Sequence, residues 1–326
     1  MGNPVKFYEK EVNKIENKFS VLFKGRKPKS LYEPCSFIMQ SGGKRLRPFL
    51  VVISNYAVSG RLSGAYNAAA AVELLHNFTL VHDDIMDNAD KRRGRPTLHI
   101  KYNLSTAILA GDNLIGLAYE YLLKDCKDND KKVLQTFTKG MIEVCEGQSM
   151  DTDFESQKKV TIPEYDLMIS KKTAALAEMC CSIGAQIGGG NNIEIKALAD
   201  YGKYLGMAFQ YQDDLLDIMG DETEFGKTVG GDLVAGKKTY LFLRALEKAK
   251  GPQKTALQKV IKNKGIRRNQ VKKYREIYVD LGVLVDAQKE IKKYTDKALK
   301  SLNKLTNHEA KEILIWLANA LIKRNK

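Results

Sequence analysis

The spacing of proline constrains the fold of this 326-residue chain more than any other feature. The chain has seven prolines, and none falls between Pro163 and Pro252. Because proline removes a backbone donor and interrupts helices, such a gap favours long helices over many short strands. Apolar residues recur at helical spacing in several long segments, among them 65–87, 105–123 and 193–220. With no series of strands and no internal repeat beside them, the sequence predicts an all-α fold in one domain, 1–326.

Local signals predict where several of these helices begin and end. Thr161, followed by Pro163, is typical of a helix start, and the triple glycine at 188–190 would end that helical segment. Ser105 is the expected N-cap of the helix over 105–123, and Asn307 is the expected N-cap of the last one. Further helices are predicted over 5–24, 41–58, 132–155 and 237–250.

Composition limits the cellular compartment that we expect for this chain. It is 44% hydrophobic, which allows a large core, yet no run approaches the roughly 18 consecutive apolar residues that a membrane span needs. The N-terminal residues lack the apolar core of a signal peptide. The five cysteines have no zinc-site spacing, so they are expected to be reduced and structural. We therefore expect a cytoplasmic protein without a transmembrane segment.

The formal net charge is +14. Such a balance favours a partner that carries phosphate, whether nucleic acid, anionic lipid or a phosphorylated small molecule. A lysine-rich surface that keeps a protein in solution would give the same number. Charge alone does not separate these interpretations.

Two acidic motifs repeat the same spacing. In "HDDIMD", Asp83 and Asp87 are four residues apart, and in "QDDLLD" Asp213 and Asp217 are four apart with Asp214 between them. On a helix, like charges at this spacing share one face and repel, and a divalent cation turns the repulsion into attraction. Paired carboxylates that leave room for water and substrate phosphates are the usual ligands of Mg²⁺. Both motifs therefore predict magnesium sites, whereas the glycine and glutamate positions of a calcium-binding EF-hand loop are not matched.

Basic residues accompany both acidic motifs. Arginine pairs bidentately with phosphate oxygens, and lysine beside flexible glycine backbone can also hold them. No single one of these residues is diagnostic, because a solvated surface would use the same types. As a set they accompany the two carboxylate clusters and predict binding of phosphate groups: Lys44, Arg45, Arg47, Arg92, Arg93, Lys171, Lys172, Lys227, Lys237 and Lys238.

Seven segments in order resemble one known family, the trans-isoprenyl diphosphate synthases. They are "GGKRLRP", "LLHNFTLVHDDIMDNADKRRGRPT", "AILAGDNL", "CEGQSMD", "SKKTAAL", "FQYQDDLLD" and "FGKTVGGDLVAGKKT". The resemblance covers nearly the whole chain. It implies a helical barrel in which the two Asp-rich helices face each other across a deep cavity, as a homodimer that uses isopentenyl diphosphate and allylic diphosphates but no nucleic acid.

The same resemblance assigns roles to individual residues. Three Mg²⁺ ions, or Mn²⁺ in their place, would be held by Asp83, Asp87 and Asp213, with Asp214 and Asp217 assisting. The isopentenyl diphosphate would be bound by Lys44, Arg47, His76 and Arg93. The allylic diphosphate would be bound by Arg92, Lys172, Thr173, Gln210, Lys227 and Lys237. Catalysis itself would depend on Asp83, Asp87, Lys172, Asp213 and Lys227.

The length of the product depends on the helix that precedes Asp83. In the family, the fifth residue before the acidic motif closes the floor of the chain cavity, and here that residue is Phe78. Thr79 would leave space, and Leu75 lies one turn before Phe78. The pattern resembles geranylgeranyl synthases and implies a C20 product, with C15 and C25 open. A helical wheel gives partial support only, because Phe78 lies well off the face of Asp83.

Three other functions stay open at this point. A terpene cyclase also uses an acidic motif and Mg²⁺, but it needs no second diphosphate site such as Lys44, Arg47 and Arg93. A basic nucleic-acid-binding protein would leave the paired aspartates unexplained. An inactive subunit of a heteromeric synthase is disfavoured because both acidic motifs are intact. His82 and His99 are expected to be local hydrogen-bonding groups rather than metal ligands.

Overall fold

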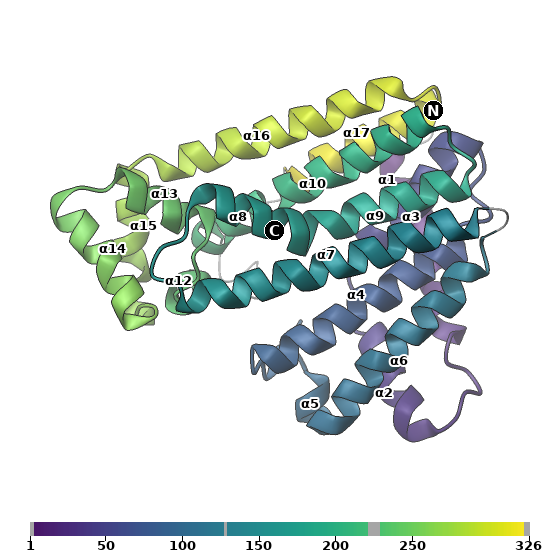
Figure 1. The fold of residues 1–326 in the computed structure, drawn as a ribbon, viewed down its shortest axis with the longest axis horizontal. Helices are drawn as coiled ribbons and strands as arrows, with labels where there is room; N and C mark the ends of the chain where they lie inside the picture. Colours follow the sequence, from purple (N-terminus) through teal and green to yellow (C-terminus); the bar gives the residue numbers. More distant parts are fainter. Residues whose placement is uncertain (1–2, 127–128, 221–228, 323–326) are drawn as a thin grey trace. The chain divides into compact units, whose positions relative to one another are not determined.

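The computed structural model describes residues 3–126, 129–220 and 229–322, and these residues are almost entirely helical (Figure 1). The strands in this part of the chain are a short antiparallel pair, β1 (Lys91–Arg92) and β2 (Arg95–Pro96). The predicted all-α fold is therefore confirmed. No helix among the described residues is long and apolar enough to cross a bilayer.

The contacts divide the chain into two compact units. Unit 1 consists of 1–138, 179–199 and 304–314, and unit 2 of 139–178, 200–303 and 315–326. Unit 1 holds α1 (Pro4–Val21), α2 (Lys29–Met39), α3 (Leu46–Ser59), α4 (Tyr66–Met86), α5 (Leu98–Lys101) and α6 (Leu104–Leu123). The helices α7 (Asp130–Ser156), α9 (Ala175–Ile187), α10 (Asn192–Met219) and α17 (His308–Ile322) contribute residues to both units.

Unit 2 contains the remaining elements. They are α8 (Ile162–Ile169), the π-helical turn η1 (Ser170–Ala174), α12 (Gly231–Val234), α13 (Tyr240–Lys248), α14 (Gly251–Asn263), the 3₁₀ turns η2 (Arg268–Gln270) and η3 (Leu302–Lys304), α15 (Val271–Asp280) and α16 (Val283–Ser301). Its core contains large side chains such as Phe154, Tyr211, Phe242 and Tyr278. The hydroxyl of a further buried tyrosine, Tyr165, donates to the carboxylate of Asp214, and this pair belongs to the site described below.

Small residues bring the two central helices of unit 1 together. α4 and α6 lie side by side (Figure 1) and pack together extensively. The residues 68–71 of α4 are all alanine and fully buried. Ala107, Ala110 and Gly111 are buried on α6. Because methyl groups and hydrogens leave little bulk between two helices, α4 and α6 can pack closely, and this fixes the end of α4 that carries Asp83.

Most predicted helix ends are confirmed. Thr161 caps α8 in a capping box with Glu164, and the side chain of Asn307 accepts a hydrogen bond from Ala310 N (3.1 Å). α9 ends at Ile187, directly before the triple glycine. The predicted cap Ser105 is wrong, because Asn103 has the extended backbone of an N-cap and accepts from Thr106 N (2.8 Å), so Ser105 already lies inside the helix.

Candidate functional site

Asp83 and Asp87 lie at the C-terminal end of α4. Asp87 is the C-cap, and its backbone N–H donates to the carbonyl of Asp83 (2.8 Å). Asp83 is half-buried and Asp87 is exposed. Helix C-termini disfavour anions through the backbone dipole, so two accessible carboxylates one turn apart favour a positively charged ligand.

Asp84, between them, has a different environment. Only 2% of this residue is exposed, and its Oδ1 accepts from Arg92 Nε at 2.7 Å. Burial raises the pKa of Asp84, while Arg92 opposes that rise. Asp84 therefore orients Arg92 from inside the protein rather than offering its charge to a ligand.

The arginine pair Arg92–Arg93 is placed by the β1–β2 hairpin. Arg93 and Gly94 both have positive φ (51° and 75°), as a two-residue turn between antiparallel strands requires. The guanidinium of Arg93 lies over Gly43, where an added Cβ would come within 2.7 Å of its Nη1, and this Nη1 donates to the carbonyl of Gly42. The glycine loop before α3 thus makes room for Arg93.

Further basic residues of unit 1 gather around His76. Arg47 Nη1 lies 3.2 Å from His76 Nε2. Burial, with Arg47 and Arg93 as the next causes, lowers the pKa of His76 well below its usual value, so the neutral ring can accept this contact. Arg45 has a left-handed backbone and is buried in ion pairs with Glu16 and Glu73, which anchors the loop. Of the residues predicted for isopentenyl diphosphate, Arg47, His76 and Arg93 are brought together, and Lys44 precedes Arg45 in the same loop.

In unit 2, Asp214 of the second acidic motif is the centre of a buried network. Its carboxylate accepts from the Tyr165 hydroxyl (2.5 Å), Gln210 Nε2 (3.0 Å) and Tyr240 N (3.0 Å). Burial, with the charge of Asp232, raises the pKa of Asp214 to about 7, and the three donors oppose that rise. Thr173 Oγ1 donates to Gln210 Oε1 (2.9 Å) and extends the network. This fixed chain of contacts orients Thr173 and Gln210.

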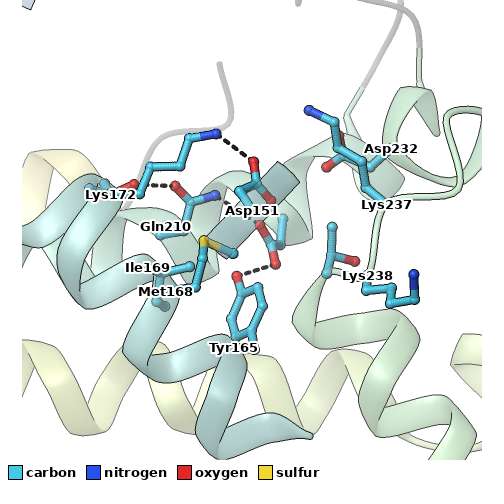
Figure 2. Close-up of a pocket in the computed structure, with 12 residues that line it drawn as sticks. Asp151, Tyr165, Met168, Ile169, Lys172, Gln210, Asp232, Lys237 and Lys238 are labelled. Carbon is cyan, nitrogen blue, oxygen red and sulfur yellow. Dashed lines mark hydrogen bonds and ion pairs between the residues drawn. The ribbon is translucent and has the colours of Figure 1, made fainter. Parts of the chain in front are cut away.

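A pocket of about 110 Å³ lies over this network. It is lined by Asp151, Tyr165, Met168, Ile169, Lys172, Thr173, Gln210, Asp214, Asp232, Lys237, Lys238 and Thr239. Figure 2 shows Lys172 paired with Asp151 on one side of the pocket and Lys237 beside Asp232 on the other. Since one water occupies roughly 10–15 Å³ of such a cavity, the pocket can hold several waters or a phosphate group.

The two adjacent lysines of "GKKT" point in different directions. The ammonium of Lys238 donates to the carbonyl oxygens of Phe154 and Glu155 and points away from Asp232 in Figure 2. Lys237 extends on the side of Asp232. The geometry thus agrees with the choice of Lys237 over Lys238 as a phosphate ligand.

A π-helical turn presents Lys172 and Thr173 to the pocket. The turn η1 continues α8, and Ala175 N donates to the carbonyl of Ser170, five residues earlier. Two glycines of neighbouring helices accommodate its backbone: an added Cβ would lie 2.2 Å from Lys172 N at Gly147, and 2.6 Å from the Cα of Ala174 at Gly206. A side chain at either glycine would therefore require the π-helical turn to move.

Other predicted residues are placed differently. Asp213 and Asp217 flank Asp214 on α10 but do not line the pocket, and the side chain of Asp217 accepts from Asp232 N (3.3 Å). Lys227 lies outside the described residues. Asp151 and Asp232 were missed, although both stand in the quoted motifs. The signal for Asp232 is its position five residues before Lys237 on a glycine-rich loop.

The aspartates of the two motifs and of the pocket can meet the ligand requirements of Mg²⁺. No three His, Cys, Asp or Glu side chains converge on one point in the described part of the chain. Mg²⁺ does not need such a cage, because one or two carboxylates with waters and substrate phosphates complete its six ligands. Asp83 with Asp87 in unit 1, and Asp214 and Asp232 in unit 2, fit that requirement.

The predicted chain-length residues all lie on the buried side of α4 or next to it. Leu75 is fully buried and Phe78 is 9% exposed, while the Thr79 hydroxyl donates to the carbonyl of His76 (2.8 Å). The ring of Phe78 packs edge to face on His82, with centroids 4.6 Å apart. The Nε2 atom of His82 is buried without a hydrogen-bond partner.

Comparison with known proteins gives a consistent result. The chain is 44% identical over 253 residues to a short chain isoprenyl diphosphate synthase of Methanocaldococcus jannaschii, a match that covers 77% of each chain. It is 39% identical to a geranylgeranyl diphosphate synthase of Sulfolobus acidocaldarius over 98% of both. A crystal structure of geranylgeranyl pyrophosphate synthetase from Pyrococcus horikoshii superposes with a TM-score of 0.90 at 37% identity, over 98% of each chain.

The sequence model of the family described as polyprenyl synthetase matches residues 28–279, most of the chain. This span includes both acidic motifs, the glycine loop before α3 and the π-helical turn. The predicted resemblance is therefore confirmed: the chain belongs to the polyprenyl synthetase family, the trans-isoprenyl diphosphate synthases.

Proposed function

We propose that this protein condenses isopentenyl diphosphate head-to-tail with C5–C15 allylic diphosphates to give all-trans geranylgeranyl diphosphate, with release of pyrophosphate. The observation that carries the proposal is the pocket of unit 2, where Lys172, Lys237 and the hydroxyl of Thr173 accompany three aspartates. Relatives named geranylgeranyl diphosphate synthase support the C20 product.

The pocket is suited to an allylic diphosphate. Lys172, Thr173, Gln210 and Lys237 would contact its phosphate oxygens, together with Arg92 and with Lys227, which lies outside the described residues. When the allylic C–O bond breaks, negative charge grows on the departing pyrophosphate. Cationic groups fixed near that charge stabilise the transition state more than the ground state.

Both acidic motifs are proposed to serve this same diphosphate. Asp83, Asp87 and Asp213 would hold three Mg²⁺ ions, or Mn²⁺ in their place, with Asp214 and Asp217 assisting directly or through water. Asp232 joins this set because it lines the pocket beside Lys237. When bound, the ions would neutralise the leaving group as Lewis acids.

Isopentenyl diphosphate is assigned to the basic residues of unit 1. Arg47, Arg93 and the glycine loop with Lys44 would hold its phosphates, while neutral His76 keeps Arg47 in place. Its double bond then attacks the allylic cation, and proximity supplies much of the advantage. A proton leaves the new unit. No side chain of the predicted set is a dedicated base, so the released pyrophosphate is the proposed acceptor.

Removal of divalent cations gives a direct test. With EDTA we expect product formation from labelled isopentenyl diphosphate and C5, C10 or C15 starters to fall below detection, and excess Mg²⁺ to restore it. Chromatography of the dephosphorylated alcohols measures both yield and length. Elongation that persists in EDTA contradicts the proposal. Consumption of the allylic diphosphate in Mg²⁺ without isopentenyl diphosphate identifies a terpene cyclase instead.

We further propose that the enzyme is a cytoplasmic homodimer. α6 and the preceding α5 carry large exposed apolar side chains in unit 1, namely Ile100, Leu104, Ile108 and Leu109. Apolar side chains clustered on one surface are typical of protein interfaces. None of the five cysteines forms a disulfide, which agrees with a reducing compartment.

The dimer is tested by one charged substitution. Leu109, which is 60% exposed, is expected to lie in the interface, so Leu109→Glu should halve the mass measured by light scattering. The control is Ile193→Glu, at an apolar residue of α10 that is 64% exposed and distant from α6 in sequence. A wild-type monomer, or a Leu109→Glu dimer of unchanged stability, contradicts this interface.

A further inference from the structure

The ring of His82 is wedged between Phe78 and the backbone of α6. Its centroid lies 4.6 Å from that of Phe78, at an interplanar angle of 65°. On the other side, a Cβ added to Gly111 would lie 2.4 Å from His82 Nε2 and 2.7 Å from Cδ2. Such distances are impossible between non-bonded atoms. The ring therefore occupies this place only because residue 111 has no side chain.

Packing on both sides positions the Nε2 edge of the ring, which no hydrogen bond holds. His82 Nε2 has no hydrogen-bond partner, and the nearest carboxylate oxygen, Asp112 Oδ1, is 3.8 Å away on a largely exposed side chain. Glycine weakens a helix interior relative to alanine, so a buried glycine in the middle of α6 has a steric reason. The close packing of α4 on α6 at this level supplies that reason.

We propose that Gly111 and His82 together set the length of the product by fixing the ring of Phe78. The inference rests on the proposed function and on the role that the family resemblance gives Phe78, the floor of the chain cavity. Both are positioning residues, because they act through Phe78 and not on the reacting atoms. Added volume at 111 pushes the imidazole against Phe78 and shortens the product. Removal of the imidazole frees Phe78 to move aside and lengthens it.

The test compares product lengths of full-length variants with Mg²⁺, labelled isopentenyl diphosphate and a C10 starter. We expect Gly111→Ala to raise the ratio of C15 to C20 alcohol at least threefold. The matched control is Gly116→Ala on the same helix, where an added Cβ meets no atom within 4 Å, and its ratio should equal that of the wild type. An unchanged ratio in Gly111→Ala overturns the proposal.

A double-variant cycle distinguishes a loss of the contact between the His82 ring and Gly111 from a general destabilisation of α6. In the His82→Ala background we expect products longer than those of the wild type, and no further effect of Gly111→Ala, because the ring that the methyl would strike is gone. The double variant should also recover any folding lost by Gly111→Ala alone. Equal effects of Gly111→Ala in both backgrounds overturn the wedge. If the wild-type protein forms no elongated product, the proposed function itself is rejected. This outcome is distinct from the two results that overturn the role of Gly111 and His82.

Discussion

Replacement of Asp83 by asparagine is expected to lower the rate of elongation by roughly 10²–10³-fold, the range seen when one group that stabilises transition-state charge is lost. Asp83 lies in the last turn of α4, one turn before Asp87, and remains half-buried. Loss of one negative charge at a helix C-terminus relieves repulsion, so the stability of the protein should stay equal or rise. Steady-state rates and thermal unfolding are measured on the same variant. We expect the rate to fall while the melting temperature stays equal or rises.

The neighbouring Asp84→Asn provides the matched comparison. Because Asp84 is buried against Arg92, its substitution leaves the guanidinium without its carboxylate partner and should lower the melting temperature. Asp83→Asn should thus lower the rate without a loss of stability, whereas Asp84→Asn should lower the stability as well, because Asp84 holds Arg92 from inside the protein. An Asp83→Asn variant with more than a tenth of the wild-type rate is incompatible with its proposed role.

The second large effect is expected from Gly147→Ala. Its methyl group would lie 2.2 Å from Lys172 N and 2.6 Å from the Cα of Lys172, so α7 and the π-helical turn must separate. Overpacking of this kind typically destabilises by about 1–3 kcal/mol. Lys172 and Thr173 would leave their positions by Asp151 and Gln210, and the rate of elongation should fall at least ~10²-fold through the lost diphosphate contacts.

A second readout distinguishes this displacement from simple unfolding. At temperatures where the variant is fully folded, KM for the allylic substrate should rise while KM for isopentenyl diphosphate, assigned to unit 1, stays constant. Gly116→Ala serves again as the alanine control at an open helical position. A folded Gly147→Ala variant with wild-type KM for the allylic substrate would show that the turn tolerates the methyl group.

The sequence motifs predicted much of this architecture because the signals are local. The spacing of Asp83 and Asp87 on one helix, and the capping box of Thr161, depend on neighbours within four residues. The burial of Asp84 was not predictable in that way, because its partner Arg92 returns through a hairpin. Likewise, two adjacent lysines look equivalent in sequence, and only the carbonyl of Phe154, distant along the chain, turns Lys238 aside.

The π-helical turn is the feature that local patterns could not supply. No propensity marks 170–174 as different from the helix on either side, and the turn depends on Gly147 and Gly206 from α7 and α10. The position of Asp232 also depends on tertiary contacts, since the short helix α12 that carries it packs against the end of α10. Non-local contacts of this kind decide how the candidate ligands are oriented.

The extra residue in η1 also acts as a phase shift. Each residue turns an α-helix by about 100°, and a π-helical turn contains one residue more than an α-helical turn. The side chains after residue 174 are therefore rotated about the helix axis relative to those of α8. Lys172 and Thr173 can then face a phosphate group, although the helical segments before and after them are largely apolar. Deletion of any one residue from 170–174 would restore regular winding and rotate Lys172 out of line. This short span should therefore tolerate other side chains at Ser170 and Lys171, but it should tolerate no change in length.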